Sequence, residues 1–79
     1  MEWEKIRDIT ADILQIRPED VHMDSAFFDD LGADSLDVYR IITEIEDTFS
    51  VEVSDILSGY TPQTVGALYN RVSDLLGLS

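Results

Sequence analysis

Three stretches of the chain carry apolar residues at the spacing of an α-helix, and this pattern most limits the folds that are open to it. The stretches cover residues 2–15, about 35–49, and 62–76. In the last one, Thr61 suits the cap, Pro62 the first helical position and Gly77 the residue after the final turn. A helix with an apolar stripe must bury it, so the stripes predict helices packed on one core. They consist of Trp3, Ile6, Ile9, Ile13 and Leu14, of Val38, Ile41, Ile42, Ile45 and Phe49, and of Val65, Leu68, Tyr69, Val72, Leu75 and Leu76.

The connections between these stretches predict one long loop and one short helix. Pro18 is expected to end the first helix, because proline cannot continue its hydrogen-bonding pattern. Residues 17–34 show no sustained period, but their apolar residues are spaced like anchors, so we expect an ordered, packed loop. Residues 51–53 alternate like an extended connection, after which Ser54 can cap a short turn of helix through Leu57 that Gly59 ends. The anchors of the long loop are Val21, Met23, Phe27, Phe28 and Leu31.

The predicted fold class is therefore all-α: a small bundle of three longer helices plus one short helix, with a long ordered first loop. A length of 79 residues suits a single domain, which we expect to span residues 1–79.

The chain is strongly acidic, with a net charge of −12. Such a surface repels phosphates, so nucleic acid is disfavoured as a partner and a basic protein surface is favoured. Acidity also serves solubility, so charge alone leaves both interpretations open. No apolar run is long enough for membrane insertion, and the N-terminus shows no signal pattern. We therefore expect the protein to be located in the cytoplasm. We also expect it to be a monomer.

The predicted second helix has one face that is not needed for the core. At about 100° per residue, Leu36 and Tyr39 fall opposite the apolar stripe, one turn apart and bordered by charged residues. Single exposed apolar residues are common, but two in this arrangement favour a partner-binding strip. The same face includes Arg40, Thr43 and Asp47, with Glu46 at its margin.

The start of this helix carries the candidate for chemistry. Asp34 suits the cap, and Asp37 three residues later completes an approximate capping box. Ser35 then becomes the first helical residue, with its hydroxyl free to face solvent. No base is placed near it by the sequence, since the one histidine, His22, lies in the loop. Ser35 is thus a poor nucleophile but a good acceptor for modification by another enzyme, and we predict that the chain is not itself an enzyme.

Residues 27–37, Phe-Phe-Asp-Asp-Leu-Gly-Ala-Asp-Ser-Leu-Asp, resemble the segment around the modified serine of acyl carrier proteins. Asp34-Ser35-Leu36 is similar to the attachment motif of that family. Residues 17–21 resemble the start of the family's loop, residues 44–49 the acidic end of its second helix, and residues 64–66 the opening of its last helix. The resemblance covers nearly the whole chain and is strongest between residues 24 and 49.

The resemblance implies a covalent cofactor and a set of partners. A phosphopantetheinyl transferase would attach 4′-phosphopantetheine from coenzyme A to Ser35, between Asp34 and Leu36. The thiol of that arm would carry acyl groups as thioesters, which fits a chain without cysteine. Acyl-processing enzymes of fatty-acid, polyketide or related lipid biosynthesis would use their own basic patches for docking. The strip of this chain that they would contact consists of Leu36, Asp37, Tyr39, Arg40, Thr43, Glu46 and Asp47. The acyl chain would lie between the helices against Ile41, Ile45, Ile56 and Leu68, which serve equally well as core residues.

Three residues of the strip depart from the family pattern. Arg40 stands where fatty-acid carriers usually have an acidic residue, Thr43 occupies an often apolar position, and Tyr39 is bulkier than the usual aliphatic residue. A reversed charge weakens docking to a basic patch by repulsion. This favours a specialised carrier with a dedicated pathway, while drift at a tolerant surface site remains the alternative.

Two other functions stay open at this point. A discrete aminoacyl or peptidyl carrier is less favoured, because peptidyl carriers typically show Gly-Gly-x-Ser where this chain has Gly32-Ala33-Asp34-Ser35. An acidic cation-binding regulatory protein is disfavoured because an EF-hand loop opened at Asp29 would place Arg40 where a bidentate glutamate is needed. We predict no dedicated metal site, although a weak divalent site could form from Asp29, Asp30, Asp34 and Asp37.

Overall fold

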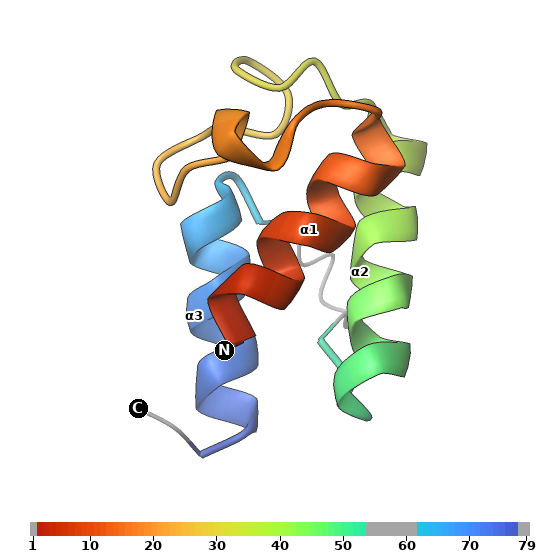
Figure 1. Ribbon diagram of the computed structural model, residues 1–79. Coiled ribbons are helices and arrows are strands. Elements are labelled where there is room, and N and C mark those ends of the chain that lie inside the picture. Colours follow the sequence, from red (N-terminus) through yellow and green to blue (C-terminus); the bar gives the residue numbers. More distant parts are fainter. Residues whose placement is uncertain (1, 54–61, 78–79) are drawn as a thin grey trace.

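The computed structural model describes residues 2–53 and 62–77. In chain order its elements are α1 (Glu2–Leu14), the 3₁₀ turn η1 (Pro18–Asp20), α2 (Ser35–Phe49) and α3 (Val65–Leu75). Helix α1 packs against both α2 and α3, and the long loop after η1 covers one end of the bundle (Figure 1). The described residues form helices and no strand, apart from an isolated bridge between Ala26 and Thr64. The all-α prediction is confirmed. Within these ranges, none of the helices has the length and apolar character that crossing a membrane requires.

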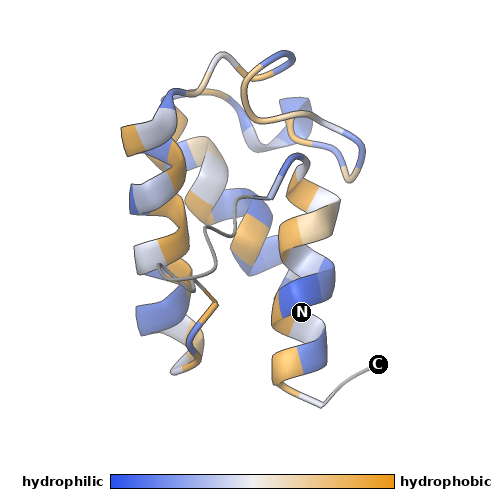
Figure 2. Cartoon of the chain, turned by 180° about the vertical axis from the view of Figure 1, so that it is seen from behind, coloured by the Kyte–Doolittle hydropathy of each residue, from blue (hydrophilic) through white to orange (hydrophobic). Residues whose placement is uncertain are grey.

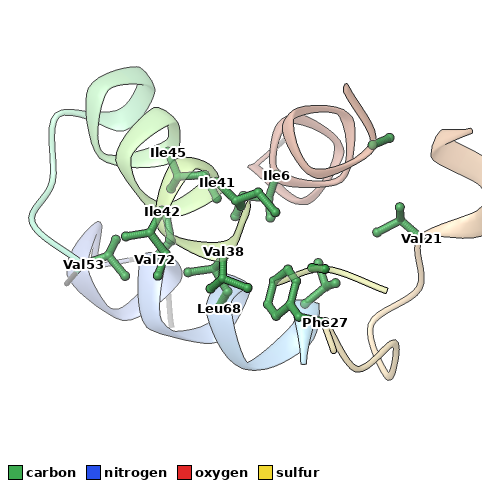
Figure 3. Packing of buried hydrophobic residues seen from close by; sticks show 13 residues of the cluster. Ile6, Val21, Phe27, Val38, Ile41, Ile42, Ile45, Val53, Leu68 and Val72 are labelled. Carbon is green, nitrogen blue, oxygen red and sulfur yellow. The ribbon is translucent and has the colours of Figure 1, made fainter. Parts of the chain in front are cut away.

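The core lies where α1, α2 and α3 face one another, and Figure 3 shows its side chains converging from all three helices and from the loop. Figure 2 shows that each helix carries both apolar and polar residues along its length, as one buried face requires. The apolar residues of the core are Ile6, Ala11, Val21, Phe27, Ala33, Val38, Ile41, Ile42, Ile45, Val53, Val65, Leu68 and Val72.

Helix α1 ends at Leu14, one residue earlier than expected, and Pro18 is not what stops it. Gln15 adopts a left-handed backbone with φ of 60°. Its amide donates to Asp12 O at 3.3 Å, and the Ile16 amide donates to Ala11 O at 3.0 Å. These two bonds form a Schellman motif, which closes the helix before the proline is reached. Pro18 instead opens η1, which the sequence did not predict.

The long loop is ordered, but only part of its expected anchoring is correct. Val21 and Phe27 are buried, and Leu31 packs against the core. Met23 and Phe28 are 44% and 43% exposed, so the prediction that their side chains anchor the loop is wrong. Met23 lies two residues after buried Val21, and Phe28 directly follows buried Phe27. Because the loop has no regular period, the burial of one residue does not determine whether a nearby residue is buried too.

Helix α3 begins three residues later than predicted. Its cap is Thr64, whose Oγ1 accepts a hydrogen bond from the Ala67 amide at 3.0 Å, so Pro62 is not the first helical residue. The reason is tertiary, because Phe27 N donates to Gln63 O at 3.1 Å and Val65 N donates to Ser25 O at 3.0 Å. These bonds hold residues 63–65 against the loop, and Thr64 between them keeps an extended backbone.

The remaining predictions for the connections have mixed outcomes. Gly77 follows the last turn of α3 with φ of 74°, as expected, whereas Leu75 is 41% exposed and does not belong to the core. Helix α2 ends at Phe49 as predicted, and Val53 beyond it is buried. The predicted short helix from Ser54 to Leu57, its stop at Gly59, and the cap assigned to Thr61 lie outside the described residues.

Candidate functional site

The first turn of α2 is fixed by two aspartates that bind each other's backbone. Asp34 has extended backbone geometry, and its Oδ1 accepts a hydrogen bond from the Asp37 amide at 2.8 Å. Asp37 Oδ2 accepts in return from the Asp34 amide at 3.2 Å. The predicted capping box is therefore confirmed, and helix α2 begins at Ser35.

The segment before this turn is anchored on the core. Phe27 is fully buried, and its carbonyl accepts a hydrogen bond from the Ala33 amide at 2.9 Å. Asp30 Oδ2 accepts from the Ala26 amide at 2.8 Å, while the amides of Asp30 and Leu31 both donate to Ala26 O. The start of α2 is thus attached to the same loop that holds the start of α3.

Ser35 is exposed as the first residue of α2. The amides of Ser35 and Leu36 lie in the first turn, where a helix offers them no acceptor of its own. The positive end of the helix dipole and these donors suit a phosphate ester on the serine oxygen. His22 lies instead in a groove lined by Trp3, Arg7 and Pro18, so it is not placed beside Ser35. Within the described residues, the geometry offers an accessible hydroxyl without a histidine to activate it.

The family model described as "Phosphopantetheine attachment site" matches residues 4–72. The chain belongs to the acyl carrier protein family. It is 47% identical over 55 residues to the acyl carrier protein of Clostridium acetobutylicum. This alignment covers 70% of this chain and 71% of that protein. The acyl carrier proteins of Campylobacter hominis and Clostridium perfringens are each 40% identical over 53 residues. Each of these two alignments covers 67% of this chain. They cover 67% of the Campylobacter hominis protein and 70% of the Clostridium perfringens protein.

Membership in the acyl carrier protein family establishes the general role of the chain. It carries acyl groups on phosphopantetheine, and it is a carrier rather than an enzyme. It works with a phosphopantetheinyl transferase and with acyl-processing enzymes. When attached, phosphopantetheine supplies the thiol that the chain itself lacks. The exposed Ser35 and the open amides of the first turn fit this group.

The predicted partner strip is only partly a free surface. Leu36 and Tyr39 are 72% and 58% exposed, and Arg40, Thr43 and Asp47 are exposed as well. Glu46 is half-buried, because its Oε2 accepts a hydrogen bond from the Val53 amide at 2.8 Å. Asp37 is half-buried and takes part in the cap. Glu46 and Asp37 therefore hold the backbone at the two ends of α2.

Helix α1 adds residues to this surface that the sequence analysis missed. Ile9, Asp12 and Ile13 line a groove of about 440 Å³ together with part of α2. The residues on the α2 side are Tyr39, Arg40, Thr43 and Glu44. Ile9 and Ile13 were assigned to the core because the apolar stripe of α1 is wide, and their half-burial could have been inferred only from the position of α2.

Three of the four predicted acyl-pocket residues lie in the centre of the bundle. Ile41 and Ile45 of α2 and Leu68 of α3 are fully buried, and Figure 3 shows them among the converging core side chains. Ile56 lies outside the described residues. The structure brings the three together as core residues.

The four aspartates considered for a weak cation site do not form one. Among the described residues, no three acidic or histidine side chains gather closely enough to hold a metal ion. Asp30 binds the Ala26 amide, and Asp34 and Asp37 bind each other's amides, so their carboxylates serve the backbone instead.

Proposed function

We propose that phosphopantetheine is attached to Ser35 Oγ. One observation supports this assignment most directly: Ser35 is an exposed hydroxyl at the first position of α2, on a turn that the capping box holds in place. In the transfer, a bond forms between Ser35 Oγ and the phosphorus of the phosphopantetheine moiety of coenzyme A. The pyrophosphate bond breaks, adenosine 3′,5′-bisphosphate leaves, and the serine proton goes to a base of the transferase, because the one histidine of the chain lies in a different groove.

The assignment is tested by incubating the protein with coenzyme A and a broad-specificity phosphopantetheinyl transferase, followed by intact-mass measurement. We expect one phosphopantetheine adduct on the wild type and none on Ser35→Ala. Ser50→Gly is the matched control, because Ser50 is the exposed cap at the other end of α2 and its φ of 56° suits glycine. An adduct that survives Ser35→Ala would contradict the assignment.

We also propose that acyl-processing enzymes dock on the exposed face of α2 through Leu36, Tyr39, Arg40, Thr43 and Asp47. The exposure of two large apolar side chains, one turn apart on the same face and bordered by charge, supports this strip, because such a patch suits a partner interface. Asp47 and the net charge of −12 favour enzymes with basic docking patches.

Arg40 gives this strip an unusual charge. Arg7 pairs with Asp8 at 3.0 Å and Arg17 with Asp20 at 3.4 Å, whereas Arg40 has no ion pair with any part of the chain that the structure describes. An unpaired cation on the docking face repels a basic patch and attracts a carboxylate. The carrier is therefore proposed to serve a dedicated set of enzymes rather than standard fatty-acid synthase partners.

For the cargo, the proposal places the acyl chain between the helices, against Ile41, Ile45 and Leu68, with Ile56 as a further candidate from the sequence. These side chains are wholly apolar, and the α2 pair lies on the helix that begins at Ser35. Residues 1–79 are proposed to act as one monomeric carrier domain in the cytoplasm.

A further inference from the structure

One polar side chain of the core has no partner among the described residues. Thr10 of α1 is 0% exposed, and its Oγ1 is the only buried side-chain oxygen or nitrogen within residues 2–53 and 62–77 that makes no hydrogen bond. Buried Ser25 shows the contrast, because its Oγ accepts a hydrogen bond from the His22 amide at 3.0 Å. A buried hydroxyl without a partner is costly, so its presence calls for an explanation.

The helix itself does not satisfy this hydroxyl. A threonine in a helix can turn Oγ1 toward the carbonyl four residues earlier, as Thr43 does with Tyr39 O at 2.8 Å. Thr10 makes no such bond to Ile6 O. Its O–H is therefore a buried donor without an acceptor among the described residues.

Thr10 lies on the buried face of α1, which turns toward the core where the cargo is proposed to lie. The buried residues of α1 are Ile6, Thr10 and Ala11, and Figure 3 shows Ile6 beside Ile41 in the centre of the bundle. Thr10 is one turn further along the same face. Ile9, which precedes it, and Ile13, three residues later, share a groove with Tyr39, which is one turn beyond Ser35. In Figure 1, α1 runs toward the end of the bundle where α2 begins.

We propose that the Thr10 hydroxyl donates a hydrogen bond to an oxygen on the acyl chain, so that the carrier favours cargo with a keto or hydroxyl group over plain hydrocarbon cargo. This inference rests on the proposed attachment at Ser35. It names a specificity-determining residue on the buried face of α1, distinct from the exposed strip of α2. An oxygenated chain satisfies the unpartnered donor, whereas a hydrocarbon chain leaves it unsatisfied and excludes water from it.

The test compares carriers loaded at Ser35 with octanoyl or with oxooctanoyl chains that carry the keto group at successive carbons. The readout is the melting temperature of each loaded form. For the wild type, we expect at least one oxooctanoyl form to melt about 4–8 °C above the octanoyl form, the shift of one hydrogen bond in a domain of this size. In Thr10→Val, which keeps the shape and removes the hydroxyl, this difference should disappear.

Two further variants make the result decisive. Thr10→Ser keeps the hydroxyl and should keep the preference, while Thr48→Val changes an exposed threonine of α2 and should leave it unchanged. Equal differences in wild type and Thr10→Val at every keto position would overturn the proposal, as would loss of the preference in Thr10→Ser. If intact mass shows that the wild type takes up no phosphopantetheine, the proposed attachment at Ser35 is wrong. That failure is distinct from a failure of the Thr10 proposal, which is measured on loaded carriers.

Discussion

Gly66 lies directly against the backbone of Met23. The Gly66 amide donates a hydrogen bond to Met23 O at 2.8 Å, and a Cβ built on Gly66 would lie 2.5 Å from that oxygen. Met23 itself is exposed, so its backbone rather than its side chain ties the long loop to the first turn of α3. The same loop leads to Ser35, and this contact therefore helps to hold the proposed attachment site on the bundle.

Replacing Gly66 by alanine should destabilise the protein. The new methyl group must push the loop away from α3, which costs more than the gain in helix propensity, and we expect a net loss of about 1–2 kcal/mol. Urea unfolding followed by circular dichroism measures the change. Asn70→Ala, at an exposed position of the same helix, is the control and should be neutral or slightly stabilising. An unchanged midpoint for Gly66→Ala would show that the loop yields freely at this contact.

The capping box should contribute measurably to the stability of α2. Asp34→Ala removes the acceptor of the Asp37 amide, and we expect a loss of about 1 kcal/mol. Asp34→Asn removes the same charge but keeps an oxygen at Oδ1, so it should lose less. Because both variants relieve the same charge repulsion, the difference between their unfolding free energies reports the cap alone. Equal losses would mean that the hydrogen bond to Asp37 does not stabilise the helix.

The sequence predicts α2 well because its signals are local. The capping box depends on residues three apart, and the burial of Val38, Ile41 and Ile45 follows from helical periodicity. The exposure of Leu36 and Tyr39 follows from the same geometry, and their predicted face is confirmed. The exposed serine at the first helical position is therefore predictable from the amino-acid sequence alone.

The errors arise where distant segments decide the structure. The start of α3 shifts to Val65, with Thr64 as its cap, because the backbone around Ser25 and Phe27 binds residues 63–65. Met23 and Phe28 could not be assigned as exposed, because a loop without a period gives no rule for which side chains turn inward. Thr10 was missed because only apolar residues were counted in the stripe of α1, although its spacing from Ile6 places it on the buried face.

Without cargo, Thr10→Val should stabilise the protein. The substitution keeps the volume of the side chain and removes a buried hydroxyl that has no partner, so we expect a gain of about 1 kcal/mol in the unfolding free energy. For a domain of this size, that gain corresponds to a rise of about 4–8 °C in melting temperature. Differential scanning calorimetry of the unmodified protein measures it. Loss of stability in Thr10→Val would mean that the hydroxyl has a partner, such as a buried water.

Salt should raise the stability of the wild type. With a net charge of −12, repulsion between acidic side chains opposes the folded state, and screening weakens this repulsion. The screening length falls from about 30 Å at 0.01 M salt to about 8 Å at physiological ionic strength. We expect the melting temperature to rise over this interval and to rise less in a variant with several exposed acidic residues neutralised. A melting temperature that is independent of salt would contradict the role of repulsion.

Reversing the charge of Arg40 should change the choice of partner. Arg40 is exposed beside Tyr39 and lacks an ion pair with the described residues, so Arg40→Glu removes a repulsive charge without breaking a bridge in the carrier. We expect the variant to bind a fatty-acid ketosynthase with a basic docking patch about 3–10-fold more tightly at low salt, and the difference to shrink as salt rises. Surface plasmon resonance at several salt concentrations measures both effects.

Arg17→Glu is the matched control, because it changes the net charge equally but lies in the loop region, paired with Asp20. Equal affinities of the wild type and Arg40→Glu for the ketosynthase would contradict the proposal of a dedicated partner. Equal gains in affinity for Arg40→Glu and Arg17→Glu would assign the effect to net charge rather than to the docking face.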